Sequence, residues 1–109
     1  MTDYLADVKK YDANASEAVV AGLVRHCGIA LRNKDSSNVS CSDQAEVDRV
    51  KNGFCKKKLA VTDSDEKIDA VLAGVCATMK ADRLKGRVTF YYLVAHKYGK
   101  LDLFIKKAA

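Results

Sequence analysis

The sequence contains no proline, and only six of its 109 residues are glycine. Proline breaks the interior of a helix and glycine weakens it, so few positions in this chain oppose helix formation. Hydrophobic residues make up 49% of the chain and charged residues 30%, which is typical of a globular protein rather than a disordered one. We therefore expect an all-α fold, with residues 1–109 forming a single domain.

Long apolar runs are also absent. No run approaches the roughly 18 residues that a membrane-spanning helix requires. The first residues, MTDYLADVKKYD, mix acidic and basic side chains and lack the charged-then-apolar order of a signal peptide. These absences predict a protein of the cytoplasm that has no membrane partner.

Closely spaced cysteine pairs are missing as well. The four cysteines are Cys27, Cys41, Cys55 and Cys76, and no two of them form a Cys-x-x-Cys pair. Zinc sites usually take their ligands from such pairs, so we expect no metal and no other cofactor. In a reducing cytoplasm, isolated cysteines stay as free thiols rather than disulfides. Phosphate-binding loops and nucleophile elbows are absent too, which favours a protein that is not an enzyme.

Apolar residues recur at intervals of three and four along most of the chain, as they do on one face of a helix. This spacing predicts a compact bundle of four main helices, at about 16–31, 43–58, 64–83 and 87–98, with a short N-terminal helix at 3–11. The polar stretch RNKDSSNVS separates the first two main helices as a loop. Ser42 is a candidate N-cap of the second, and Thr62 and Ser64 are candidates for the third.

The stretch GRVTFYYLVAHKYGKLDLF, from Gly86 to Phe104, is the most apolar and aromatic part of the chain. Its β-branched and aromatic residues have high strand propensity, which opposes a helix. Strict alternation fails, however, because Phe90 to Val94 are all apolar or aromatic, and a single strand would lack a partner. We predict a helix at 87–98 that is apolar on both sides and lies in the middle of the bundle. Tyr98 and Gly99 would end it, and LDLFI would fold back on the core.

The segments MTDYLADVKKY, KDSS and RVTFYYLVAHKYGKLDLF resemble a bacterial family of small uncharacterised proteins, domain of unknown function 2853. The resemblance covers nearly the whole chain. It implies a compact bacterial domain, and it supplies no catalytic residues.

The densest basic cluster lies near the end of the predicted helix 43–58. It comprises Lys56, Lys57 and Lys58, with Lys51 earlier on the same helix. Contact with phosphates would make this cluster a weak, sequence-independent nucleic-acid site. Lysines that complement the negative end of a helix dipole explain the same pattern. The net charge of +5 permits either interpretation.

Cys41 is the candidate for a reactive thiol, because it lies just before a helix start, where backbone N–H groups favour a thiolate. Its neighbours Asp43 and Glu46 oppose that effect. Cys27 and Cys76 are expected to be small core residues. His96 could reach one of them in the fold, but His26 diverges from the adjacent Cys27 on a helix.

The absence of convergent catalytic groups favours a non-enzymatic interaction or structural module as the first hypothesis. Its partner would be an unknown protein or a second copy, bound through aromatic surface. For Tyr91, Tyr92 and Tyr98 the alternative is that the rings lie in the core and the hydroxyls reach its rim. Nucleic-acid binding through Lys56–Lys58 is the second hypothesis, and a thiol redox role of Cys41 is the third.

Overall fold

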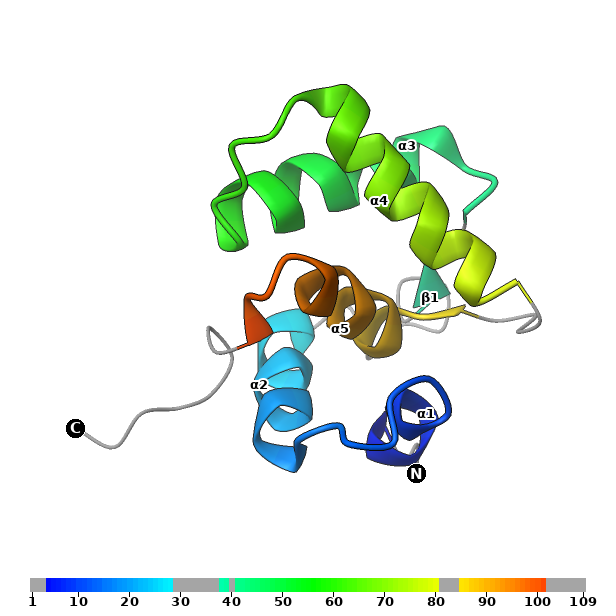
Figure 1. The fold of residues 1–109 in the computed structure, drawn as a ribbon, viewed down its shortest axis with the longest axis vertical. Helices are drawn as coiled ribbons and strands as arrows, with labels where there is room; N and C mark the ends of the chain where they lie inside the picture. The colour runs from blue at the N-terminus through cyan, green and yellow to red at the C-terminus, as the bar shows by residue number, and fades with distance from the viewer. Residues whose placement is uncertain (1–3, 29–37, 40, 81–84, 102–109) are drawn as a thin grey trace.

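Helices form nearly all the regular structure of this protein (Figure 1). The computed structural model describes residues 4–28, 38–39, 41–80 and 85–101. The helices are α1 (Tyr4–Lys9), α2 (Glu17–Cys27), α3 (Gln44–Arg49), the π-helix η2 (Val50–Lys58), α4 (Asp65–Thr78) and α5 (Arg87–Lys97). They pack into a compact bundle, which confirms the predicted all-α architecture.

Helix α5 lies at the centre of the bundle, between α1 and α2 on one side and η2 and α4 on the other (Figure 1). Of its first nine residues, Arg87 to Ala95, all are buried except Leu93, which is partly buried. Burial on every side explains how residues of high strand propensity form a helix here: the surrounding helices contribute the stabilising contacts, and these outweigh intrinsic preference. The predicted central helix at 87–98 is confirmed.

The C-terminus of α5 is closed by glycine. Gly99 has a φ of 65°, a left-handed conformation that side chains other than glycine's adopt at a cost. This turn lets the Lys100 N–H donate to the Ala95 carbonyl at 2.9 Å, a bond typical of a helix C-cap. The predicted helix end at Tyr98 and Gly99 is therefore confirmed, and the LDLFI tail lies outside the described residues beyond Leu101.

The predicted helix at 43–58 is continuous, but it consists of an α-helical part followed by a π-helical part. Its first part, α3, begins after Asp43, whose side chain accepts from the Ala45 N–H at 3.0 Å. Asp43 is therefore the N-cap, one residue beyond the expected Ser42. The second part, η2, has π-helical geometry, which hydrophobic periodicity does not distinguish from an α-helix.

Helix α4 begins after Ser64, one of the two expected caps, which accepts from the Lys67 N–H at 3.4 Å. The helix ends at Thr78, before the predicted end at residue 83. Gly86 belongs to the short strand β2 (Lys85–Gly86) and directly precedes α5. Strand β2 pairs antiparallel with β1 (Asn38–Val39), within the segment expected to be a loop.

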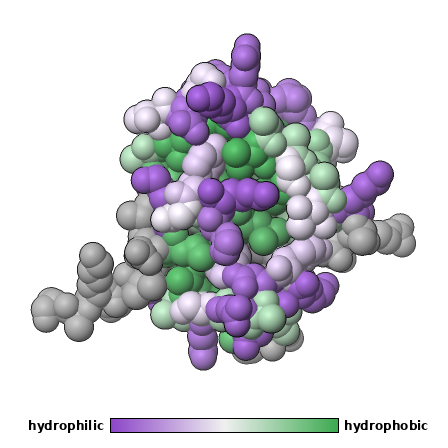
Figure 2. Space-filling model, viewed as in Figure 1, coloured by the Kyte–Doolittle hydropathy of each residue, from purple (hydrophilic) through white to green (hydrophobic). Residues whose placement is uncertain are grey.

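Hydrophilic side chains cover most of the face drawn in Figure 2, and apolar side chains are exposed near its middle. Within the described residues, no helix has the length and apolar character needed to cross a membrane.

Candidate functional site

Cys41 and Cys76 form a disulfide bond across two parts of the fold. Cys41 lies in the turn before α3, and Cys76 lies near the end of α4. Their Cα atoms are 6.0 Å apart, within the range that a disulfide requires. The expectation of four free thiols is therefore wrong for this pair, and Cys76 is a half-buried bonded residue rather than a small core residue. The chain folds α4 against the segment around α3, and this brings together two cysteines separated by 35 positions.

A pocket of about 370 Å³ borders the disulfide. Helix α3 lines it with Gln44 and Val47, and α4 lines it with Asp69, Leu72, Ala73 and Cys76. We call it the α3–α4 pocket. Cys41 and Cys76 are both half-buried and both line this pocket. A small molecule in the pocket therefore lies next to the disulfide.

Two of the lysines predicted to bind nucleic acid, Lys51 and Lys56, form ion pairs with acidic residues of α3 and α4. The Lys51 ammonium lies 3.2 Å from an Asp69 oxygen and 3.6 Å from an Asp48 oxygen. The hydrogen bond from Lys51 to Asp69 raises the pKa of Lys51. Lys56 lies 2.6 Å from Asp65, and this bond lowers the pKa of that carboxyl group.

Lys57 and Lys58 are exposed at the end of η2. The structure therefore places the four predicted lysines on one helix, but two of them share their charge with carboxylates. Nucleic-acid binding through Lys51 and Lys56–Lys58 stays a prediction.

The other two cysteines, Cys27 and Cys55, are free thiols in the core. Burial raises the pKa of each to about 11, so both stay protonated at neutral pH. A protonated, buried thiol is a poor nucleophile. The expectation that Cys27 is a core residue is confirmed.

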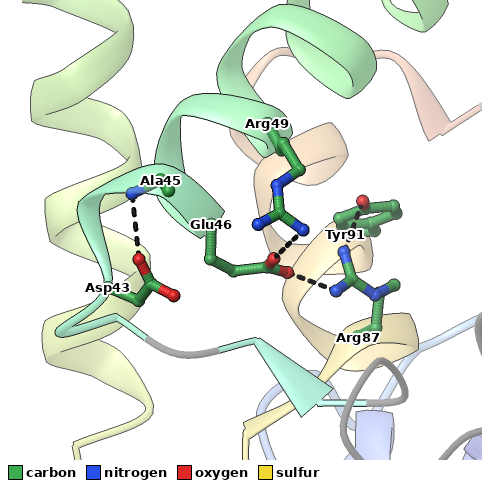
Figure 3. Close-up of polar contacts among 6 residues, drawn as sticks. All are labelled: Asp43, Ala45, Glu46, Arg49, Arg87 and Tyr91. Atoms are coloured by element: carbon green, nitrogen blue, oxygen red, sulfur yellow. Dashed lines mark hydrogen bonds and ion pairs between the residues drawn. The ribbon is translucent and has the colours of Figure 1, made fainter.

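A buried ion pair joins α3 to α5 (Figure 3). The Arg87 guanidinium donates from Nη2 to Glu46 Oε1, and from Nη1 to the Tyr91 hydroxyl at 2.8 Å. Arg49 also pairs with Glu46, at 3.3 Å, but its own side chain is 73% exposed, against 10% for Arg87. Arg87 and Glu46 therefore fix the position of α3, the helix that follows Cys41.

Sequence reasoning missed both the disulfide pairing and this ion pair. No local pattern marks Cys41 and Cys76 as partners, because their contact depends on the packing of α4. The burial of Glu46 could have been predicted from the sequence. Glu46 precedes Val50 and Phe54 at intervals of four, so it lies on the same helix face as these apolar residues. A charged residue on a buried stripe requires a buried partner.

Tyr91, Tyr92 and His96 have partners on other parts of the fold. The Tyr91 ring stacks on Phe54 with centroids 3.9 Å apart. The Tyr92 hydroxyl donates to Asp12 at 2.6 Å, and this bond lowers the pKa of Asp12. His96, which in principle could have reached Cys27 or Cys76, has its Nε2 3.7 Å from Asp12 Oδ2.

The rings of Tyr91, Tyr92 and Tyr98 pack in or against the core. This agrees with the second of the two interpretations of these residues, in which the rings belong to the core rather than to an aromatic surface. Tyr91 and Tyr92 are buried, and Tyr98 is partly buried with its hydroxyl out of contact with solvent. These rings therefore do not supply the aromatic surface through which self-association was expected.

Among the described residues, no group of three or more His, Cys, Asp or Glu side chains is placed to hold a metal ion. The model of a family described as "Protein of unknown function (DUF2853)" matches residues 3–102. No match was found among curated proteins.

Proposed function

This chain belongs to the DUF2853 family, and because the family description assigns no activity, we propose from the geometry that the protein is a non-enzymatic module switched by reversible oxidation of Cys41 and Cys76. The observation that carries the proposal is the position of this pair. It joins two separate elements, is half-buried, and borders the α3–α4 pocket. The proposal develops the predicted redox role of Cys41 and gives that residue a partner.

The contrast with the remaining cysteines supports the proposal. Cys27 and Cys55 are buried thiols with a pKa of about 11, so exchange with a thiol or disulfide in solution is disfavoured at both. Only the Cys41–Cys76 pair combines a partner sulfur with access from a pocket among the residues described here. The chemistry is therefore confined to one place on the molecule.

Each reduction adds two electrons and two protons and separates the two sulfur atoms. The turn before α3 then loses its covalent link to α4, whereas α3 stays attached to α5 through Glu46 and Arg87. We expect reduction to change the surface around the α3–α4 pocket and to leave the bundle intact. A protein partner with a higher affinity for one form of this surface would then bind according to the redox state. In this way the module would act without catalysis.

A redox titration tests the proposal. The protein is equilibrated in thiol–disulfide buffers of known potential, quenched with acid and alkylated under denaturing conditions. Mass spectrometry of the intact protein then gives the number of alkylated cysteines. A switch shows two alkylated cysteines at high potential and four at low potential, with a midpoint between about −180 and −300 mV, the range of cellular thiol buffers. The variant Cys27→Ala/Cys55→Ala is the matched control and should have the same midpoint.

Two results would contradict the proposal. A pair that stays oxidised at potentials below roughly −320 mV is a permanent structural link rather than a switch. A protein with four alkylated cysteines under every oxidising buffer does not form the bond at all.

A further inference from the structure

The α3–α4 pocket has a chemical asymmetry along its length. Asp69, Leu72, Ala73 and Cys76 line it from one face of α4. Asp69 and Cys76 are seven positions apart, which is roughly 10 Å along a helix that rises 1.5 Å per residue. The disulfide therefore lies toward one end of the pocket and the Asp69 carboxylate toward the other, with apolar side chains between them.

The Asp69 end of the pocket carries a net negative charge. Lys51 lies between Asp69 and Asp48, at 3.2 Å and 3.6 Å, so two carboxylates share one ammonium group. The Lys51 side chain is only 11% exposed, whereas those of Asp69 and Asp48 are 48% and 45% exposed. A ligand that enters the pocket therefore meets the Asp69 carboxylate, which lines it, and a positively charged group is the one that this carboxylate favours.

Gln44 offers a polar contact along the wall formed by α3. Its side-chain nitrogen donates one hydrogen bond to Asp48 at 2.9 Å, and its amide oxygen is an acceptor that it can present to a ligand. That oxygen accepts a hydrogen bond from an N–H group, such as that of a peptide bond. Val47 and Leu72 provide the apolar contacts beside it.

Resting on the proposed function, we propose that the α3–α4 pocket binds short thiol-bearing peptides with a cationic group about 10 Å from the sulfur, and that these are the reductants of the Cys41–Cys76 disulfide. A peptide of three residues spans about 10 Å when extended, which matches the distance from Asp69 to Cys76. The thiol lies at the disulfide and the cationic side chain lies at Asp69.

The exchange takes place in two balanced steps. The peptide thiolate attacks the sulfur of Cys76, which shares α4 with Asp69; a new sulfur–sulfur bond forms, and the Cys41–Cys76 bond breaks. Cys41 leaves as a thiolate and takes a proton from water. A second peptide thiolate then attacks the peptide sulfur of the mixed disulfide, and a bond between the two peptides forms. Cys76 leaves as a thiolate and takes a proton, so two peptide thiols are oxidised and one protein disulfide is reduced.

The test compares three blocked tripeptides that differ only at the end distant from the thiol: acetyl-Cys-Gly-Lys-amide, acetyl-Cys-Gly-Gln-amide and acetyl-Cys-Gly-Glu-amide. Their thiols are alike, so differences in the reduction rate of the full-length protein report contacts away from the sulfur. At low salt we expect the lysine peptide to react about fivefold faster than the glutamine peptide, the factor that one unit charge about 4 Å away supplies in water. The glutamate peptide should be slowest, and added salt should reduce the differences.

Two variants locate the effect. In Asp69→Asn, the lysine peptide and the glutamine peptide should reduce the protein at equal rates, because the substitution removes the carboxylate at the end of the pocket. Asp63→Asn removes the same charge from an exposed position that does not line the pocket, and it should preserve the preference. Acid-quenched reactions should carry the peptide on Cys76.

Equal rates for the three peptides, or a preference that survives Asp69→Asn, would overturn this inference and leave the redox switch in place. An adduct on Cys41 would overturn the assigned direction of attack. Failure of all three peptides and of dithiothreitol to reduce the native protein would contradict the proposed function itself.

Discussion

Arg87 is a charged residue at the start of a helix that is buried on nearly every side. Its side chain is 10% exposed and that of Glu46 is 11% exposed, so both charges are removed from most of their water. Such a pair contributes little net stability over an apolar pair, but the loss of one partner leaves an uncompensated buried charge. Its role here is to fix α3 relative to α5.

The variant Glu46→Gln should therefore lower the free energy of unfolding by about 3 kcal/mol, as measured in urea. The matched variant is Arg49→Gln, which removes the exposed partner of the same carboxylate. It should cost less than about 1 kcal/mol, because exposed ion pairs contribute little. Equal effects of the two variants would show that Arg87 does not depend on Glu46 for its charge compensation.

The two buried thiols make stability depend on alkaline pH. Burial raises the pKa of Cys27 and of Cys55 from 9.0 to about 11 in the folded protein. Because the folded pKa is the higher one, the stabilising contribution is complete below about pH 9 and is lost as pH rises toward 11. The free energy of unfolding should fall between pH 8 and pH 10.5.

The variant Cys27→Ala/Cys55→Ala provides the control for this pH dependence. Its free energy of unfolding should change less over the same interval, because tyrosines and lysines still titrate but the thiols are gone. An identical slope in the variant and the natural sequence would exclude the thiols as its cause.

At the scale of elements, the π-helix η2 ends in an unusual way. Ala60 has a φ of 55°, in the left-handed region that favours glycine, and the Val61 N–H donates to the Cys55 carbonyl at 3.0 Å. This turn places Val61 in the core, where its side chain is 8% exposed. The residue that makes the turn is therefore held in a conformation that costs on the order of 1 kcal/mol.

The substitution Ala60→Gly should raise the free energy of unfolding by about 0.5 kcal/mol, since relief of the backbone conformation exceeds the added flexibility of the unfolded chain. The same substitution in the exposed interior of α4, Ala70→Gly, should lower it by about 1 kcal/mol. Thermal or urea unfolding of both variants measures the difference. A loss of stability at both positions would contradict the left-handed turn at Ala60.

The disulfide is an element-scale constraint, because it joins α4 to the turn before α3. A bond that closes a loop of this length stabilises a protein by roughly 2–4 kcal/mol, mainly by restricting the unfolded chain. We expect Cys41→Ser/Cys76→Ser to lower the free energy of unfolding by that amount and to keep the helical circular dichroism of the folded protein. Loss of the helical signal under native conditions would show that the bundle requires the bond.

Most helices could be predicted from the sequence, because a helix reveals its buried face through the spacing of its apolar residues. The stripe Ile68, Leu72 and Val75 located α4, and the absence of proline left few competing structures. The π-helical geometry of η2 and the earlier end of α4 depend on packing between elements, and spacing along the chain does not contain them. The disulfide was missed for the same reason, and the expectation of a reducing cytoplasm argued against it.

At the scale of the whole molecule, the excess positive charge is partly offset where lysines lie beside carboxylates. The net charge is +5, yet Lys51 and Lys56 are paired with carboxylates of α3 and α4. Long-range attraction to a polyanion depends on the sum of all these charges, and paired lysines release fewer counterions on binding. Weak nucleic-acid binding through Lys51 and Lys56–Lys58 therefore stays a prediction.

Fluorescence anisotropy with a labelled DNA duplex tests this prediction at two salt concentrations. Binding through the predicted lysines requires an affinity that falls steeply with salt and is lost in Lys56→Glu/Lys57→Glu/Lys58→Glu. The control Lys9→Glu/Lys10→Glu/Lys97→Glu changes the net charge equally at exposed sites outside η2. Equal losses in the two triple variants would assign the binding to net charge alone.

The pairing of Cys41 with Cys76 underlies both the proposed redox switch and the chemistry of the α3–α4 pocket. Peptide mapping by mass spectrometry, on protein alkylated in its native state and digested without reductant, measures this directly. We predict one cross-linked peptide pair that contains Cys41 and Cys76, with Cys27 and Cys55 alkylated only after denaturation. A cross-link to Cys27 or Cys55, or native alkylation of all four cysteines in oxidised protein, would contradict the account.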